Sequence, residues 1–406
     1  NELAMNMNAE DDYWGKKVYA EVTEPLLREL DPDRPRFPTS PYLGRPFNSP
    51  NEGDCHYSAW YDAEFIMGDM TDYRERVATG KGRFLSECAA MGAPPMHVLL
   101  RMMTLKDIGD ESAYIWEFRT KDNPYNGMDE LTHYRIIERM ARQLYGPTGS
   151  LEYKVKQMEY VQYELIRLKG EQYRRQKFSS SGLLFWMYND CWPANGLSTL
   201  DYFGGLKAGY YAAKKSFKPL AGSVEDRGSA FAVWLLNDSR ECRTGTLNVL
   251  SFTSGTTDAA IPVVRQAVSV EANSSQTVLT LDKGEHRLQA HDVLLQAVWS
   301  PDPVDGADNE PSSVIYHVQH PAELRLLPSA LEVDWRPEGD RAGEIEIASR
   351  NYARVVTIDE DMLASDNYFD MAPGERKVIR YRCRADGPAL TSMPNFSCWN
   401  QFKNEG

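Results

Sequence analysis

The chain has 406 residues, which is enough for two or three domains with cores of their own and excludes a single small module. Its formal net charge of −14 disfavours binding to nucleic acid or to anionic membrane surfaces. The mean hydropathy is −0.53, and no apolar run approaches the roughly 18 residues that span a bilayer, so we expect no membrane-spanning segment.

The first half of the chain mixes predicted helices with short strands. An apolar residue at every fourth position predicts a helix over 12–30, and the residues rich in Pro, Asn and Gly at 34–53 predict a long irregular connection. Short strands are expected at 56–61 and 83–86. Apolar residues spaced by three or four predict a long helix over 151–176, whose Lys and Arg residues we expect to face solvent.

A second strand and helix follow the long helix. The apolar run 183–188 is short, as is typical of a parallel strand covered on both faces, and a helix is predicted over 207–217. The order strand, helix, strand, helix favours a parallel α/β layer.

The second half is predicted to be almost entirely strands. Short apolar pieces alternate with Gly, Pro, Asn and Asp, a spacing typical of two β-sandwiches, with a boundary near 319–327 and an acidic hairpin loop at 300–311. The predicted strands are 231–236, 246–252, 276–281, 293–299, 314–318, 331–335, 344–347, 355–358 and 378–381.

Two glutamates stand out by their context. Glu87 follows the predicted strand 83–86, and carboxylates at the C-terminal ends of parallel strands point into the mouth of an α/β barrel. Glu2 precedes a loop and the first helix, so it too can end a strand whose body lies outside this chain. Two carboxylates facing across a barrel mouth are what glycoside hydrolysis requires. Because the chain has 59 acidic residues, surface charge is the rival interpretation of such a pair.

The segment 182–194 is more specific. Its apolar run ends in Trp186, Asn189, Asp190 and Trp192, which combine ring faces with hydrogen-bonding groups, as sugar recognition requires. Core packing at a strand end is the rival interpretation for the two tryptophans.

This segment resembles the eighth barrel strand of glycoside hydrolase family 2, especially its β-mannosidase and exo-β-glucosaminidase branches. Other segments resemble the family in the same order, so that the resemblance covers nearly the whole chain. They are Asn1-Glu2 for the acid/base motif, 31–41 and 51–60 for the fifth and sixth strands, 83–87 for the nucleophile strand, 201–211 for the eighth helix and 366–374 for the terminal immunoglobulin-like domain.

The resemblance implies a role for each matching residue. Glu87 is the nucleophile that attacks the anomeric carbon, and Glu2 is the acid/base that protonates the leaving oxygen and then activates water. It also implies retention of configuration, which places the two carboxyls about 5–5.5 Å apart. Asn1 hydrogen-bonds the sugar 2-hydroxyl, and Trp186 forms the floor of the subsite. The remaining expected binding residues are Asn189, Asp190 and Trp192 near the rim and His56 and Trp60 in the wall.

The expected fold is multidomain, α/β followed by all-β: the second half of a (β/α)8 barrel over 1–220, an immunoglobulin-like β-sandwich over 221–323 and a terminal one over 324–406. In this interpretation the first four barrel strands are absent, and half a barrel leaves open edges. We therefore expect the N-terminal half of the same enzyme, or a complementing chain, as a partner.

The expected function is a retaining exo-β-glycosidase, β-mannosidase-like, that acts on an oligosaccharide or glycoside. The run after Glu87, Cys88-Ala-Ala-Met-Gly-Ala-Pro-Pro95, departs from the family's Phe-Gly type continuation and leaves the preferred sugar open. β-Glucosaminide, β-galactoside and β-glucuronide stay as alternatives to β-mannoside. A transglycosylase with the same glutamates, and a catalytically silent carbohydrate-binding or structural fragment, are the rival functions.

Neither a metal nor an organic cofactor is expected. The two histidines of His317-Val-Gln-His320 lie three apart in a predicted strand region, where they face opposite sides. The six widely spaced cysteines predict free thiols, with Cys88 packed rather than catalytic. The start at Asn1, without Met or a signal sequence, suggests a fragment or a processed piece. It gives no clear address, and we favour a cytoplasmic location over a periplasmic or secreted one.

Overall fold

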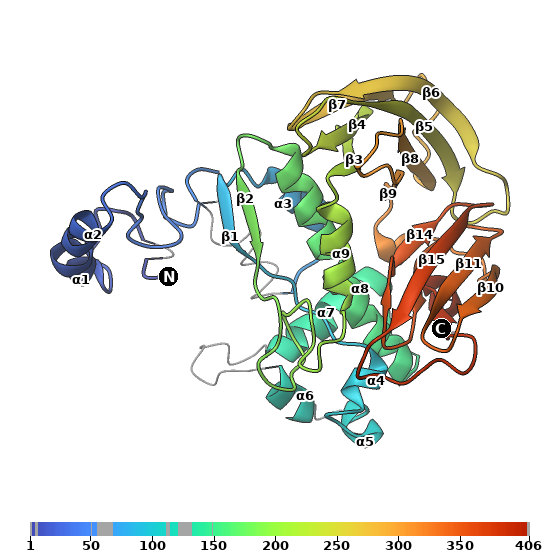
Figure 1. The fold of residues 1–406 in the computed structure, drawn as a ribbon, viewed down its shortest axis with the longest axis horizontal. Coiled ribbons are helices and arrows are strands. Elements are labelled where there is room, and N and C mark those ends of the chain that lie inside the picture. Colours follow the sequence, from blue (N-terminus) through green and yellow to red (C-terminus); the bar gives the residue numbers. More distant parts are fainter. Residues whose placement is uncertain are drawn as a thin grey trace.

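The computed structural model describes residues 2–4, 7–49, 51–54, 68–110, 114–120, 132–147 and 149–403. Figure 1 shows a central group of helices, two β units beside it and an N-terminal helical segment that projects away from the rest. The projecting segment is continuous from residue 16 to residue 30. It consists of α1 (Lys16–Val18), one stretch of π-helix (Tyr19–Thr23) and α2 (Glu24–Leu30).

The α/β region contains two strands and a set of helices. The strands β1 (Phe84–Cys88) and β2 (Gly182–Phe185) pair in parallel, as predicted, with the long helix between them in the chain. β2 begins at a glycine because the ring of Phe84 lies against it, so that a Cβ at Gly182 would meet Phe84 Cε2 at 2.1 Å. The helices are α3 (Tyr73–Thr79), α4 (Met96–Leu99), α5 (Leu105–Ile108), α6 (Tyr114–Arg119), α7 (His133–Tyr145), α8 (Leu151–Arg175) and α9 (Ala208–Ser216).

Local signals set the starts of the two long helices. The hydroxyl of Thr132 accepts the N–H of Arg135 at the start of α7, and the hydroxyl of Ser150 accepts the N–H of Tyr153 at the start of α8. Such caps satisfy backbone donors that have no partner within the helix. The predicted helix 151–176 is therefore confirmed almost residue for residue.

The expectation that the Lys and Arg residues of α8 face solvent is wrong. Helices α3, α7 and α9 and strands of the first β unit contact α8 from different sides, so most of its length is buried. Lys156 is 3% exposed and bonds Glu159 and Asp359, and Lys169 is 1% exposed. A charged side chain at this depth requires a partner, and α8 supplies or finds one for each of these groups.

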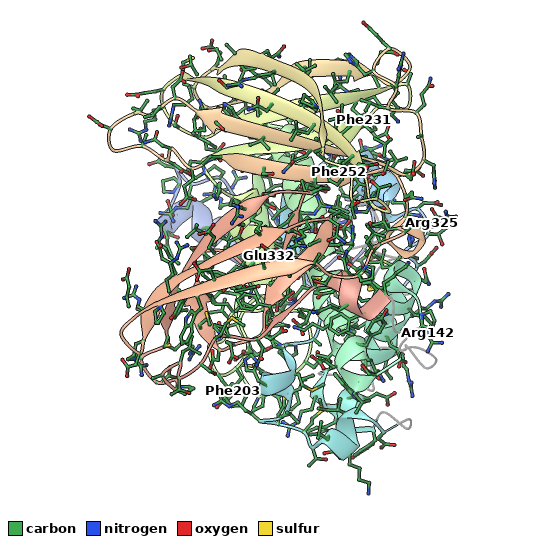
Figure 2. The ribbon with its side chains drawn as sticks, turned by 90° about the vertical axis from the view of Figure 1, so that its right-hand side faces the viewer. Arg142, Phe203, Phe231, Phe252, Arg325 and Glu332 are labelled. Carbon is green, nitrogen blue, oxygen red and sulfur yellow. The ribbon has the colours of Figure 1, made fainter. Side chains whose placement is uncertain are left out.

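The first β unit has two antiparallel sheets that share one apolar core. Phe231 lies in that core, and Phe252 contacts Tyr352 of the second β unit with ring centroids 5.5 Å apart (Phe231 and Phe252 are labelled in Figure 2). One sheet has the order β3 (Leu220–Asp226), β4 (Ala230–Asn237), β7 (Ser274–Asp282); the other has β6 (Ile261–Val270), β5 (Arg243–Thr253), β8 (Val293–Pro301), β9 (Ser312–His317).

The second β unit also has a pair of sheets, and its core continues into the helices. It is followed by α10 (Trp399–Lys403), whose Trp399 contacts Tyr145 of α7 and Tyr153 of α8 at centroid distances of 4.8 and 5.0 Å. The sheets are β10 (Leu331–Glu338), β11 (Ala342–Ser349), β15 (Arg376–Cys383), β13 (Met362–Ala364), and β14 (Phe369–Met371), β12 (Ala353–Ile358), β16 (Phe396–Ser397).

All nine predicted strands of the second half have a counterpart, and the acidic loop 300–311 does connect the antiparallel strands β8 and β9. The predictions missed β3, β6, three short strands of the second β unit and α10. The strand predicted at 56–61 lies outside the described residues. Cys191, Cys242, Cys383 and Cys398 are free, as predicted.

The apolar face of the projecting helix is exposed. The residues that predicted the helix, Trp14, Val18, Val22, Leu26 and Leu30, are between 50% and 89% exposed, so they form no part of a core in this chain. None of the described helices is both long enough and apolar enough to span a bilayer.

Candidate active site

Glu87 lies within β1, one residue before its end, and its side chain is half-buried. The expected boundary at residue 86 is thus two residues short. Leu85 pairs with Leu183 and Cys88 with Phe185, so β1 uses three steps where β2 uses two. The irregularity falls on Ser86 and Glu87. An extra residue of this kind bends a strand and re-aims a side chain, which is common next to active sites.

The segment that carries Glu2 is attached to the strand that carries Glu87. The N–H of Glu2 donates to the carbonyl of Ser40 (2.8 Å), and the hydroxyls of Ser40 and Ser86 are 2.6 Å apart. The next residue along, Leu3, donates its N–H to the Thr39 hydroxyl (3.2 Å). The structure therefore brings the chain around Glu2 next to residue 86, although the two glutamates are 85 positions apart in the sequence.

Glu2 itself is exposed and has a backbone φ of 55°. A positive φ is uncommon for a residue other than glycine and is held only where neighbouring contacts determine the backbone. Here the contacts to Thr39 and Ser40 on either side supply that constraint.

Trp186 lies beside the end of β1. Its backbone N–H donates to the carbonyl of Cys88 (2.9 Å), which continues the pairing of the two strands by one residue. The indole is 46% exposed, and Leu184 and Tyr188 are exposed as well. The expectation that this strand is covered on both faces is therefore wrong, because in the described residues β2 pairs with β1 alone and carries exposed side chains. An exposed indole at a strand end is available for stacking.

Asn189 and Asp190 lie in different surroundings. Asn189 is exposed, whereas Asp190 is 2% exposed and its carboxylate accepts the hydroxyl of Ser198 (2.5 Å). The N–H of Asp190 donates to the carbonyl of Leu200 (3.3 Å). In this structure Asp190 thus holds the turn 190–200 together and does not face solvent.

Trp192 contacts a different element from Trp186. Its ring meets the ring of Phe118 edge-on at 5.5 Å, and the guanidinium of Arg119 lies 5.7 Å from its centroid. Arg119 also donates to the carbonyl of Pro193 (3.0 Å) and so ties α6 to this segment. Trp192 is half-buried. Three further expected site residues, Asn1, His56 and Trp60, lie outside the described residues.

Three buried polar side chains that the sequence analysis did not single out hold the backbone behind the site. The Gln162 amide donates to the carbonyls of Ala90 (3.1 Å) and Ser198 (3.0 Å), and Lys169 donates to that of Ala89 (2.7 Å). Lys207 donates to the carbonyls of Gly92 (3.0 Å) and Gly196 (2.9 Å). We call Gln162, Lys169 and Lys207 the polar clamp.

The polar clamp joins residues 89–92, directly after the strand of Glu87, to residues 196–198, after the segment of Trp186 and Trp192. All three side chains are at most 1% exposed, so each bond forms where water does not compete. Gly92 permits the approach, because a Cβ there would lie 2.4 Å from Gln162 Cβ. The only signal in the sequence is long polar residues within or just before helices, which is also the pattern of a solvent-exposed face.

A further carboxyl, Asp54, lies close to the start of β1. The N–H of Arg83 donates to the carbonyl of Gly53 (2.9 Å). The backbones of Asp54 and Tyr42 form an isolated antiparallel β-bridge. Burial raises the pKa of Asp54, and the charge of Arg83 opposes that rise. Elsewhere in the described residues, no three or more His, Cys, Asp or Glu side chains gather in a way that could hold a metal ion.

Comparison with known proteins gives three kinds of match. The Ig_mannosidase family model, an Ig-fold domain, matches residues 326–393, which hold the strands β10 to β15 and confirm an immunoglobulin-like domain there. β-Mannosidase B of Aspergillus oryzae is 23% identical over 394 residues, which cover 91% of this chain and 44% of that protein. β-Mannosidase B of Emericella nidulans is 23% identical over 404 residues, covering 93% and 45%.

Solved structures agree with these relatives. The crystal structure of β-D-mannosidase from Dictyoglomus thermophilum has a TM-score of 0.79 and 21% identity, and the match covers 97% of this chain and 46% of that one. The exo-chitosanase of Amycolatopsis orientalis has a TM-score of 0.58 and 18% identity over 84% of this chain and 44% of that one. The chain spans less than half the length of the relatives it matches. As the motifs predict, it is similar over most of its length to the C-terminal portion of β-mannosidases of glycoside hydrolase family 2, and its relatives are glycoside hydrolases.

Proposed function

We propose that this chain carries the catalytic pair of a retaining exo-β-glycosidase, with Glu87 as nucleophile and Glu2 as acid/base. The observation that carries the proposal is the link between the two glutamates: the backbone of Glu2 is bonded to Ser40, whose hydroxyl contacts Ser86 next to Glu87. A retaining glycosidase uses two carboxylates, and here they lie on adjoining segments, one of them at an irregular strand end.

The proposed reaction has two steps. In the first, the Glu87 carboxylate forms a bond to the anomeric carbon while the bond to the leaving oxygen breaks and that oxygen takes the proton of Glu2. In the second, Glu2 removes a proton from water, the water oxygen attacks the anomeric carbon, and the bond to Glu87 breaks. Both displacements invert the carbon, so the sugar keeps its configuration. A carboxyl separation of about 5–5.5 Å follows from this assignment.

The proposed substrate is a terminal β-linked sugar, with β-mannoside first. The names of the relatives support this choice, since both β-mannosidases and an exo-chitosanase are among them. The exposed indole of Trp186 supports a subsite at the end of β2, where its face can stack on the C–H face of a sugar. In this assignment Asn1 binds the 2-hydroxyl, and His56 and Trp60 line the wall.

The proposed architecture is half of a (β/α)8 barrel over 1–220 with β-sandwiches over 221–323 and 324–406. Parallel pairing of β1 and β2 with α8 between them supports the barrel half, and the two pairs of sheets support the sandwiches. The exposed apolar face at Trp14, Val18 and Leu26 supports a partner that covers it, either the N-terminal half of the same enzyme or a complementing chain.

The first test is hydrolysis of p-nitrophenyl β-glycosides by the chain alone and with a chain that supplies the missing strands. We expect Glu87→Ala to abolish turnover under whichever condition is active, with a correctly folded protein. Azide should then restore turnover and give a glycosyl azide of inverted configuration, because it takes the place of the missing nucleophile. Glu29→Ala, an exposed glutamate of α2, is the matched control and should keep full activity. Failure of azide to restore turnover counts against Glu87.

The acid/base assignment has its own test. Glu2→Ala should slow glycosides with poor leaving groups far more than activated aryl glycosides, because only the former need a proton on the leaving oxygen. Equal losses on both substrate types would contradict the role of Glu2.

A catalytically silent carbohydrate-binding fragment is the second candidate. It is favoured by one observation: within the described residues, the parallel sheet consists of β1 and β2 alone. Sugar binding without turnover, both alone and after addition of the missing strands, would establish it and exclude the enzymatic proposal.

A further inference from the structure

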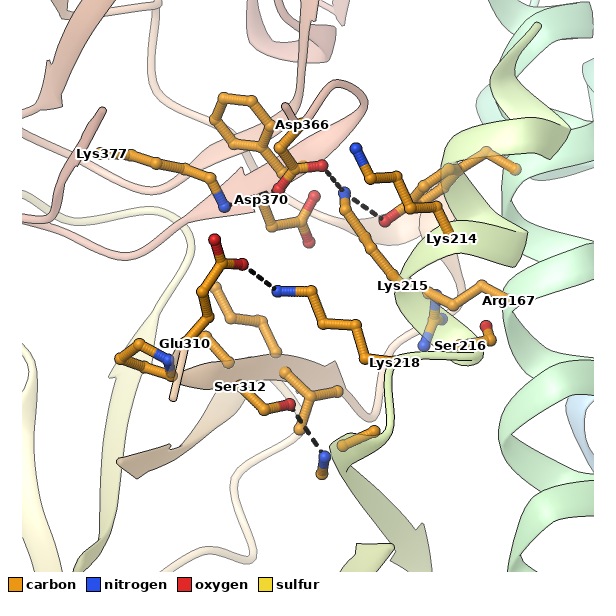
Figure 3. Close-up of a pocket in the computed structure, with 18 of the residues that line it drawn as sticks. Arg167, Lys214, Lys215, Ser216, Lys218, Glu310, Ser312, Asp366, Asp370 and Lys377 are labelled. Carbon is orange, nitrogen blue, oxygen red and sulfur yellow. Dashed lines mark hydrogen bonds and ion pairs between the residues drawn. The ribbon is translucent and has the colours of Figure 1, made fainter. Parts of the chain in front are cut away.

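A cavity lies where the end of α9 meets both β units. Its volume is about 310 Å³, and its walls come from α9, β9 and the second β unit around β14 and β15 (Figure 3). None of the residues proposed for catalysis or sugar binding lines it. It is therefore separate from the candidate active site.

Cationic side chains dominate the outer part of this cavity. Lys214 and Lys215 come from α9, Lys218 follows that helix, and Lys377 and Arg380 come from β15. The carboxylates that face them are those of Glu310, Asp366 and Asp370, which leaves an excess of two positive charges. This excess occurs in a chain whose net charge is −14.

The carboxylates of this outer part are already shared or occupied. Asp366 binds Lys215 (3.1 Å) and Lys377 (2.7 Å) with its two oxygens. Glu310 likewise binds Lys218 (2.8 Å) and Arg380 (3.5 Å).

Asp370 is held from the inner side, where it accepts the Tyr352 hydroxyl (2.6 Å) and the N–H of Val355 (2.8 Å). Each oxygen of these three carboxylates thus already has a partner.

The floor of the cavity does not reverse this balance. There the two positive charges of Arg167 and Arg354 are balanced in number by the negative charges of Glu164 and Glu171. The fifth floor charge is Glu375, whose Oε2 accepts the Gln296 amide (3.1 Å) and the N–H of Ala372 (2.8 Å). The whole lining therefore still carries one positive charge in excess.

In the part of the chain that the structure describes, Lys214 is the one lysine of the cavity lining without an ion pair. Its ammonium donates to the carbonyl of Ser365 (2.7 Å), and among the described residues no carboxylate lies within 4.0 Å of it. Figure 3 shows its nitrogen on the same side of the cavity as the ammonium of Lys215. Burial lowers the pKa of both lysines because it disfavours the charged ammonium, and a bound anion would stabilise that charge.

We propose that this cavity binds a phosphate-type dianion, either inorganic phosphate or a phosphate monoester of a sugar, with Lys214 as its principal contact. Ammonium groups on flexible stems that converge from several segments are suited to phosphate oxygens. The volume is at the lower end of the range for small-molecule sites and has room for a hexose phosphate. A ligand there bridges α9 to both β units and so stabilises their arrangement.

The test is calorimetric titration of the full chain with inorganic phosphate and with a hexose 6-phosphate, together with the thermal unfolding midpoint. Chloride at matched ionic strength and the neutral hexose are the ligand controls. We expect saturable binding and, at about 100 times the dissociation constant, an increase in midpoint of about 3 °C. Tighter binding of the hexose phosphate would identify the monoester as the preferred ligand, and equal binding would identify the phosphate group alone.

Lys214→Met is the decisive variant because it removes the unpaired ammonium and breaks no ion pair. It should fold as the parent does and lose at least tenfold in phosphate affinity. Lys106→Met, an exposed lysine of α5, is the matched control and should bind as the parent does. Absence of saturable binding to the parent, or equal binding by the parent and Lys214→Met, would overturn the proposal. Hydrolysis of aryl glycosides is measured on the same samples, so failure here is distinct from failure of the proposed catalytic pair.

Discussion

Two helical regions with the same sequence pattern have opposite surroundings in this molecule. In α8, apolar residues spaced by three or four lie in the core, and even Lys156 and Lys169 are buried with partners. In the helical segment 16–30, the residues that create an equally regular stripe are exposed. The difference teaches that periodicity indicates a helix and the face it would bury, whereas the partner of that face is set by the rest of the assembly.

The largest expected effect comes from removing the charge of Glu164 in α8. Its carboxylate bonds Arg167 (3.0 Å), lies 3.6 Å from Arg74 and accepts the Tyr73 hydroxyl (2.8 Å), all below the surface. Glu164→Gln leaves two half-buried guanidinium groups without this counter-charge, so we expect a loss of about 3–5 kcal/mol in the free energy of unfolding at pH 7. Urea denaturation measures it, and Glu29→Gln on α2 is the exposed control.

The same residue predicts a pH dependence. Burial by itself raises the pKa of Glu164, but the surrounding basic groups, Arg167 and Arg74 foremost, together lower it by more, so the pKa lies well below that of an exposed glutamate. The unfolded chain therefore takes up this proton at a higher pH than the folded chain. The contribution of Glu164 is fully present above about pH 4.5 and is lost as the pH falls through the folded pKa. If Glu164→Gln keeps the full acid sensitivity of the parent, this assignment is contradicted.

A matched pair of leucines tests the comparison directly. Leu165 of α8 is completely buried, so Leu165→Ala should cost about 2–5 kcal/mol in the free energy of unfolding. Leu26 of α2 is 50% exposed, and Leu26→Ala in the chain alone should stay within about 0.5 kcal/mol of the parent. Similar losses for the two variants would show that the helical segment 16–30 has a core partner in solution.

A smaller effect is expected from the polar clamp. Lys169→Met leaves the carbonyl of Ala89 without this buried donor, which should cost about 1–3 kcal/mol in the free energy of unfolding. Lys17→Met, whose side chain is 83% exposed, is the control in the other region and should change stability by less than about 0.5 kcal/mol. Stability of Lys169→Met equal to that of the parent would mean that Lys169 does not hold the segment after β1.

These variants also mark how far the sequence could predict the fold. The spacing of apolar residues predicts α8 and α9, and the strand-length pieces predict nine of the later strands, because these are local patterns. The missed strand β6 contains Pro262, which argues against a strand except at an edge, and β6 is an edge strand. The burial of Lys156 depends on Asp359, 203 residues away, which no local pattern contains.

The candidate site divides in the same way. Glu87 and Trp186 could be selected as candidates because they lie at predicted strand ends and because the motifs around them resemble a known family. The irregular step of β1 at Ser86, the burial of Asp190 by Ser198 and the polar clamp could not be selected. Each of them depends on contacts between segments far apart in the sequence, and a long polar side chain has the same appearance in a sequence whether water or a backbone carbonyl is its partner.

The smallest effect in the chain alone is the most informative one about the projecting helix. Leu26→Ala should leave the unfolding free energy of the isolated chain nearly unchanged, because a half-exposed side chain has little burial to lose. If the proposed partner chain covers this face, the same variant should weaken association by about 1–2 kcal/mol, a factor of about 5–30 in the dissociation constant. Glu29→Ala, on the same helix and also exposed, controls for changes in the helix itself. Equal association of Leu26→Ala and the parent would mean that the proposed partner docks elsewhere, and the exposed face of the segment 16–30 would then need a different partner.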